Sequence, residues 1–181
     1  MSLFLATLLP GIFLALLGGA LVWNGAPVAA GARALPRSTR AAWVFFGAGA
    51  LAFLWRLSRI GEADLIFFHS PTPVMIGFGV LAVLAFIYTP DFLAVRGLCV
   101  LMLLGAEPLL GAAYMEWSHP QRLLMVTAVY VGLTAALYFA AYPFRLRDFV
   151  DWAFRAPGRP RLLGAALLAY GLATTAAAFT Y

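Results

Sequence analysis

Lysine is absent from the chain, and its 12 basic residues are all arginines. Charged residues of both signs amount to only 10% of the sequence, against roughly a quarter in an average soluble domain. So few charged groups cannot keep a chain with 64% hydrophobic residues in water. This shortage excludes a soluble globular domain and indicates an integral membrane protein, with the lipid bilayer as its first partner.

Other residue types are nearly as scarce. Cysteine occurs once, at Cys99, which excludes an internal disulfide. The sequence has no glycine-rich phosphate loop and no metal-cluster cysteine spacing, so no motif indicates a cofactor. The arginines are divided among short segments rather than gathered on one basic face. We therefore do not expect nucleic acid as a partner.

What is present is a series of long apolar runs, and about 20 apolar residues suffice for a helix to cross a bilayer. The runs lack the alternation of barrel strands, so helices are expected. We predict an all-α fold, a polytopic membrane helix bundle that forms a single integral membrane domain over residues 1–181. The six transmembrane helices are predicted at 3–23, 41–58, 73–89, 92–115, 121–142 and 161–180.

The first helix is expected to be retained rather than cleaved as a signal peptide, because no basic residue precedes it. Its segment LLGGALVWNG (16–25) is similar to LLGAALLAYG (162–171) near the end of the chain. The similarity could indicate an inverted repeat of the kind found in transporters. Simple leucine, glycine and alanine composition is the favoured explanation.

The arginines also indicate the orientation. Nine lie in or beside the segments that follow the first, third and fifth helices, and three lie on the other side. Basic residues near helix ends stay in the cytoplasm, which places both termini outside. Arginine without lysine, with abundant alanine, glycine and leucine, is typical of a GC-rich bacterial genome. We expect a multi-pass protein of the bacterial cytoplasmic (inner) membrane.

Residues 143–155, PFRLRDFVDWAFR, mix aromatic and charged side chains and are too polar to span. We predict a cytoplasmic interfacial amphipathic helix, which either anchors the start of the last membrane helix or docks a partner. Pro157, Gly158 and Pro160 should separate it from that helix. Its candidate docking residues are Phe144, Arg145, Phe149, Trp152 and Arg155.

Glu107 is an acid inside a predicted membrane helix, followed by Pro108. An ionised carboxylate near the bilayer centre costs roughly 2.5–3.5 kcal/mol on insertion scales, so a partner or a proton is expected. We predict that Glu107 faces the interior of the bundle, with Tyr130 as its hydroxyl partner. The neighbouring helix carries a stripe at helical spacing, Thr127, Tyr130, Thr134 and Tyr138, expected to face Glu107.

Two interpretations of this intramembrane polar site stay open. Polar side chains in membrane bundles often only hydrogen-bond across helices and fix their packing. Glu107 could instead serve a proton or cation relay, or a ligand pocket. A second constellation, in the outer loops, could bind a divalent cation, although solvated loop charges are the default interpretation. Its weak metal candidates are Glu62, Asp64, His69, Glu116 and His119.

Three functions are compatible with these features. Small size, the lack of catalytic motifs and the interfacial segment favour a non-catalytic accessory or assembly subunit of a larger membrane complex, with other membrane subunits or further copies of the chain as partners. A small transporter or channel using Glu107 is the alternative. An enzyme acting on a lipid or quinone is a third hypothesis, less favoured because no catalytic constellation is evident.

Overall fold

The computed structural model describes residues 1–61 and 70–181, and every regular element in these ranges is helical, as predicted. The helices, in chain order, are α1 (Leu3–Trp23), α2 (Ala26–Ala34), the short 3-10 helix η1 (Leu35–Arg37), α3 (Thr39–Leu57), α4 (Thr72–Tyr88), α5 (Leu93–Ala113), α6 (Arg122–Ala141), α7 (Phe144–Ala153) and α8 (Gly158–Ala178). Of these, α2 and η1 lie in a segment that we had predicted to be a loop.

Four helices in the described part of the chain, α1, α5, α6 and α8, are long and apolar enough to cross a membrane. The apolar helix α4 has 17 residues, about 25 Å at 1.5 Å per residue. The remaining predicted span, α3, carries Arg40 and Arg56 near its two ends and is not among the four. The fold is therefore a membrane-type helix bundle in which four of the six predicted spans meet this measure.

Serine caps and prolines determine several helix ends. Ser2 accepts a hydrogen bond from the Leu5 N–H (3.4 Å), and Ser38 accepts one from the Ala41 N–H (3.2 Å), so α1 and α3 each begin after a serine. At the other end of the chain, α8 begins at Gly158, and the expectation that Pro160 lies before the helix is wrong. A proline in the first turn costs no helical hydrogen bond, because the N–H groups there have no partner within the helix.

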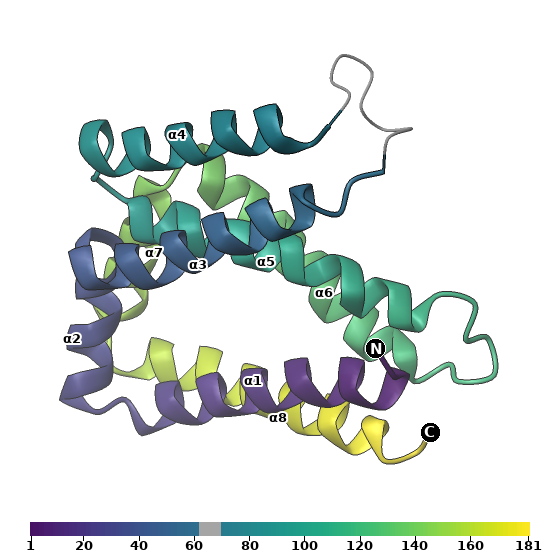
Figure 1. Ribbon diagram of the computed structural model, residues 1–181. Helices are drawn as coiled ribbons and strands as arrows, with labels where there is room; N and C mark the ends of the chain where they lie inside the picture. Colours follow the sequence, from purple (N-terminus) through teal and green to yellow (C-terminus); the bar gives the residue numbers. More distant parts are fainter. Residues whose placement is uncertain (62–69) are drawn as a thin grey trace.

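The helices α1 and α8 lie side by side in opposite directions (Figure 1). A Cβ atom added at Gly18 would lie 2.3 Å from the backbone nitrogen of Leu168, and one at Gly171 would lie 2.4 Å from that of Ala15. Gly11 and Gly164 make similar close contacts, so the glycines recur every seven residues on both helices. This spacing keeps them on one side of each helix, where backbone meets backbone.

The same contact accounts for the similarity of residues 16–25 to residues 162–171. Gly18 and Gly164 hold the same place in the two segments and face each other. A Cβ atom at either would lie 2.7 Å from the carbonyl oxygen of the other. Both segments supply small residues to one interface, and no internal repeat is needed to explain their likeness.

A second close pair consists of α3 and α5, which run in the same direction (Figure 1). A Cβ atom added at Gly97 would lie 2.2 Å from the backbone nitrogen of Phe46, and one at Gly49 would lie 3.2 Å from the Val100 side chain. Both contacts join residues 51 apart in sequence, so the two helices are parallel and in register. Val95 and Cys99 of α5 are buried against Ala136, which packs α6 onto the opposite side of α5.

Both chain termini lie at the same end of the bundle as the segment between α5 and α6, and α2 and α7 lie at the other end (Figure 1). Near the termini, Ala6 of α1 is buried with Ala106 of α5 and Met125 of α6. At the opposite end, the Asn24 side-chain amide donates to the carbonyl of Pro157 (3.4 Å) and ties the end of α1 to the start of α8. The first contact holds α1 against α5 and α6, and the second ties α1 to α8.

Substituting alanine for Gly18 should destabilise the fold, because its Cβ atom would meet the backbone of α8. Overpacking of this kind costs typically about 1–3 kcal/mol. Gly19→Ala is the matched control, since a Cβ atom there meets nothing within 4 Å. Thermal unfolding in detergent should show a lower Tm for Gly18→Ala and an equal or higher Tm for Gly19→Ala. Equal Tm values for the two variants would contradict the close contact.

Candidate functional site

An ion pair joins Glu107 of α5 to Arg56 of α3. It follows from the parallel register of these helices, because residues 56 and 107 differ by the same 51 positions as the contacting pairs nearer the helix starts. Glu107 lies six residues before the end of α5, about 9 Å of helix rise. A carboxylate at this depth is thus neutralised by a guanidinium from the last turn of the neighbouring helix.

Two predictions about Glu107 are therefore wrong. The residue is exposed on the surface of the chain rather than turned into the bundle, and its partner is Arg56 rather than Tyr130. The buried side of α5 instead carries small residues such as Ala106 and Ala113, which permit close contact with α1 and α6. The sequence did hold a signal for Arg56, since an arginine in the last turn of an apolar helix also needs a partner.

The predicted stripe of Thr127, Tyr130, Thr134 and Tyr138 does share one face of α6, but this face is exposed. The buried face of α6 is apolar and consists of Met125, Val129 and Ala136. The Thr134 hydroxyl donates to the carbonyl of Tyr130 within the helix (2.9 Å). The stripe therefore points away from α5, and the expectation that it faces Glu107 is wrong.

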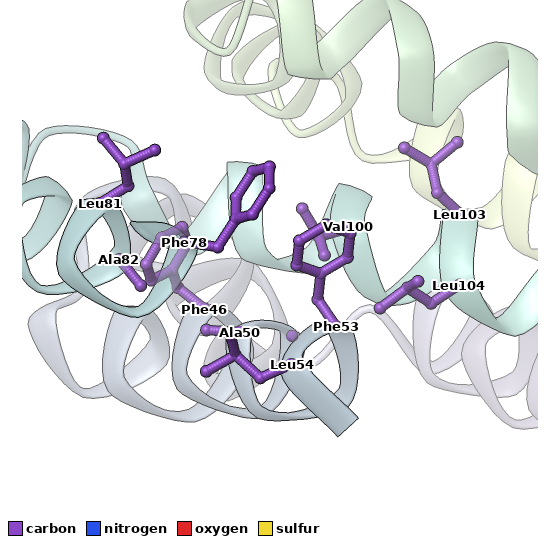
Figure 2. A pocket seen from close by; sticks show the side chains of 11 residues that line it. Phe46, Ala50, Phe53, Leu54, Phe78, Leu81, Ala82, Val100, Leu103 and Leu104 are labelled. Carbon is purple, nitrogen blue, oxygen red and sulfur yellow. The ribbon is translucent and has the colours of Figure 1, made fainter. Parts of the chain in front are cut away.

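Beside the ion pair, an apolar groove of about 460 Å³ lies between α3, α4 and α5. Figure 2 shows side chains from all three helices around it, among them Phe53, Phe78 and Val100. The eleven residues that line it have apolar side chains or none. Two lining residues lie about one helical turn from the charged pair. Leu104 precedes Glu107 by three residues on α5, and Phe53 precedes Arg56 by three residues on α3. The charged pair therefore lies at one end of the groove.

The groove exists because aromatic rings separate α4 from α3. Phe53 contacts Phe78 edge to face at a centroid distance of 5.1 Å, and Phe86 of α4 stacks on Trp43 at 4.4 Å. Phe46 also meets Phe86 edge to face, at 5.2 Å. Rings of this size hold two helix axes apart, whereas glycines bring α3 and α5 into backbone contact. The space left beneath the rings is the groove.

A helix, α7, forms in the segment predicted to be interfacial, and two arginines from elsewhere in the chain hold its end. The carbonyl of Phe154 accepts from Arg33 of α2 (3.1 Å), and the carbonyl of Trp152 accepts from Arg159 of α8 (3.0 Å). Cations are favourable at the carbonyl end of a helix. Arg33 also lies 3.9 Å from Asp151. We had counted Arg33 and Arg159 only as evidence for orientation, and both position α7.

The surface of α7 keeps its candidate docking residues accessible. Phe144, Phe149 and Trp152 are exposed, and Phe149 stacks on Trp152 at 5.8 Å. The Arg145 guanidinium lies 5.6 Å from the ring centroid of Phe144, and Arg155 is exposed. This mixture of apolar rings and cations is typical of a helix that lies in a membrane interface.

Two of the five metal candidates, Glu116 and His119, lie in the described ranges. Glu62, Asp64 and His69 lie outside them. His119 packs its ring edge to face against Tyr181 at 5.2 Å. Across residues 1–61 and 70–181, no group of three or more histidine, cysteine, aspartate or glutamate side chains could hold a metal ion.

Comparison of the chain with protein-family models, with curated proteins and with solved structures finds no match. The functional interpretation therefore depends on the geometry of the chain itself, above all on the Arg56–Glu107 pair, the groove beside it and the exposed stripe of α6.

A double-mutant cycle on Arg56 and Glu107 should reveal the ion pair. Each single change to glutamine leaves one charge without its partner, so both Arg56→Gln and Glu107→Gln should lower the free energy of unfolding. Because both side chains are about half exposed, we expect a coupling energy of about 1 kcal/mol or less. The double variant should lose less free energy of unfolding than the sum of the losses of the two single variants. Unfolding in a denaturing detergent supplies the four stabilities.

Arg59→Gln combined with Glu107→Gln is the control cycle for this experiment. Arg59 lies in the same segment but contacts the ring of Trp55, at 4.4 Å, rather than Glu107. Its cycle should be additive. Additive losses in the Arg56 cycle as well would contradict a stabilising ion pair.

Proposed function

We propose that the chain is a non-catalytic accessory or assembly subunit of a larger membrane complex, and that it docks through the exposed stripe of α6. The observation that carries this proposal is the position of Tyr130. It lies near the middle of α6 with 57% of its surface exposed. Tyrosines that face lipid usually lie at one of the two membrane interfaces, where the hydroxyl reaches water. An exposed tyrosine in the middle of a membrane helix is therefore unusual.

Two further tyrosines in this region, unlike Tyr130, are explained without a partner subunit. Tyr138 and Tyr142 lie near the far end of α6, where an aromatic belt explains them. Within the described residues, the Tyr130 hydroxyl has no hydrogen-bond partner. A hydroxyl in hydrocarbon without a partner is unfavourable. A membrane helix of another subunit, bearing a carbonyl, hydroxyl or amide at this depth, would supply the missing partner.

We further propose that α3 and α4 cross the bilayer with the other four helices, which gives six spans and both termini outside a bacterial cytoplasmic membrane. The support is the parallel pairing of α3 with α5, because a helix in register with a membrane-spanning neighbour extends across the same depth. The arginine distribution supports the orientation, since α2 and α7, with their arginines, lie at the end opposite to the termini.

Transport through Glu107 is a weaker alternative. Glu107 is exposed and already paired with Arg56, and the groove beside it has an apolar lining that provides no relay groups for a proton or cation. Catalysis has less support still, because the sequence carries no catalytic motif.

Photo-crosslinking in native membranes would test the docking proposal. A photoreactive side chain at Val131, on the exposed side of α6 beside Tyr130, should give a discrete crosslink to a different membrane protein. The same group at Leu172, exposed on α8, is the control and should label lipid. Adding Tyr130→Phe should weaken the crosslink from Val131, because the buried hydroxyl contact is lost, and Tyr142→Phe should not.

Two results would contradict the proposal. Equal, lipid-dominated labelling from Val131 and Leu172 would mean that α6 faces lipid. A crosslink from Val131 to a second copy of this chain would replace the accessory subunit with a homo-oligomer.

A further inference from the structure

The groove between α3, α4 and α5 combines an apolar channel with a charged end, which is the pattern of a binding site for an amphiphile. Its volume of about 460 Å³ lies within the range of ligand pockets, roughly 300–1,000 Å³, and its lining is apolar throughout. The channel follows α3 from Phe46 to Leu54, about 12 Å of helix. The ion pair of Arg56 and Glu107 lies beyond the Leu54 end.

That end carries two arginines. Arg56 pairs with Glu107, and the guanidinium of Arg59 lies 4.4 Å from the ring centroid of Trp55. A tryptophan beside a cation is typical of the level at which lipid headgroups lie.

An extended hydrocarbon chain fits the apolar lining, and it can follow the rings of Phe53 and Phe78 along the groove.

We propose that this groove holds one acyl chain of an anionic phospholipid, with the lipid phosphate beside Arg59 and Arg56. The apolar lining binds the chain without specificity for the headgroup, and the guanidinium of Arg59 beside Trp55 binds the anionic phosphate. The carbonyl of Leu104 is a further polar group at this end of the groove. Its usual donor in the helix would be residue 108, which is a proline and has no N–H. This site is independent of the proposed docking face, which lies on α6.

Native mass spectrometry of the full chain would test the lipid site. The purified protein is delipidated in detergent and titrated with phosphatidylglycerol or with phosphatidylcholine of identical acyl chains. One phosphatidylglycerol should bind per chain, about fivefold more tightly than phosphatidylcholine, the effect expected for one arginine near a lipid phosphate.

Two pairs of variants distinguish the contribution of the charged end to lipid binding from that of the apolar groove. Arg59→Gln should remove the preference for phosphatidylglycerol, and Arg37→Gln should keep it, since Arg37 stacks on Phe92 at the opposite end of the bundle. Ala50→Leu places a larger side chain in the groove and should weaken the binding of both lipids about equally. Ala48→Leu, exposed on the same helix outside the lining, should leave both affinities unchanged. Unfolding curves that match the parent establish that each variant is folded.

Equal affinity of the parent for the two lipids would overturn the proposal, as would an Ala50→Leu variant that binds like the parent. An equal effect of Arg37→Gln and Arg59→Gln would assign the preference to overall charge rather than to this site. Since the lipid titration uses the isolated chain and the crosslinking uses native membranes, either proposal can fail without the other.

Discussion

Direct contact between helix backbones, made possible by glycine, is the constraint on which the rest of this bundle depends. Lipid tails are as apolar as the helices, so close packing rather than the hydrophobic effect must hold membrane helices together. Gly18 and Gly171 bring the first and last helices into backbone contact, and Gly97 does the same for α3 and α5. Where phenylalanines replace glycines, between α3 and α4, the helices stand apart and the groove opens. The spacing of small and large residues thus decides where the helices pack in direct contact and where a groove is left between them.

The positions of the helices could be predicted from the sequence because apolar length, capping serines and prolines act locally. The predicted ends of α1 agree with the structure, and those of the other membrane helices differ by at most three residues. The packing interfaces were not predicted. A Cβ atom added at Gly19 or Gly105 would meet nothing within 4 Å, whereas one at Gly11 or Gly171 would meet the backbone of the other helix, and no local signal separates the two kinds. The recurrence of glycine every seven residues on two helices was the available signal, and it required comparing the helices with each other.

The candidate site was predicted less well for a related reason. The rule that an intramembrane acid faces the bundle interior assumes that its partner lies there. Glu107 instead meets Arg56 at the surface, because the parallel register of α3 and α5 brings the two helix ends together. Helical spacing correctly placed Thr127 and Tyr130 on one face, but spacing alone cannot tell which face is buried. The apolar face with Met125 and Val129 packs against the bundle, and the polar stripe is left outside.

The central claim, that α3 crosses the bilayer parallel to α5, is tested most directly by the accessibility of single cysteines. In a Cys99→Ala background, cysteine replaces Ser38, Ser58, Asp91 or Ser118, which lie near helix ends. A membrane-impermeant thiol reagent added to intact cells should label positions 58 and 118, and should reach positions 38 and 91 only after the membrane is permeabilised. Labelling of positions 38 and 58 from the same side would mean that α3 does not cross the membrane, and would contradict the account.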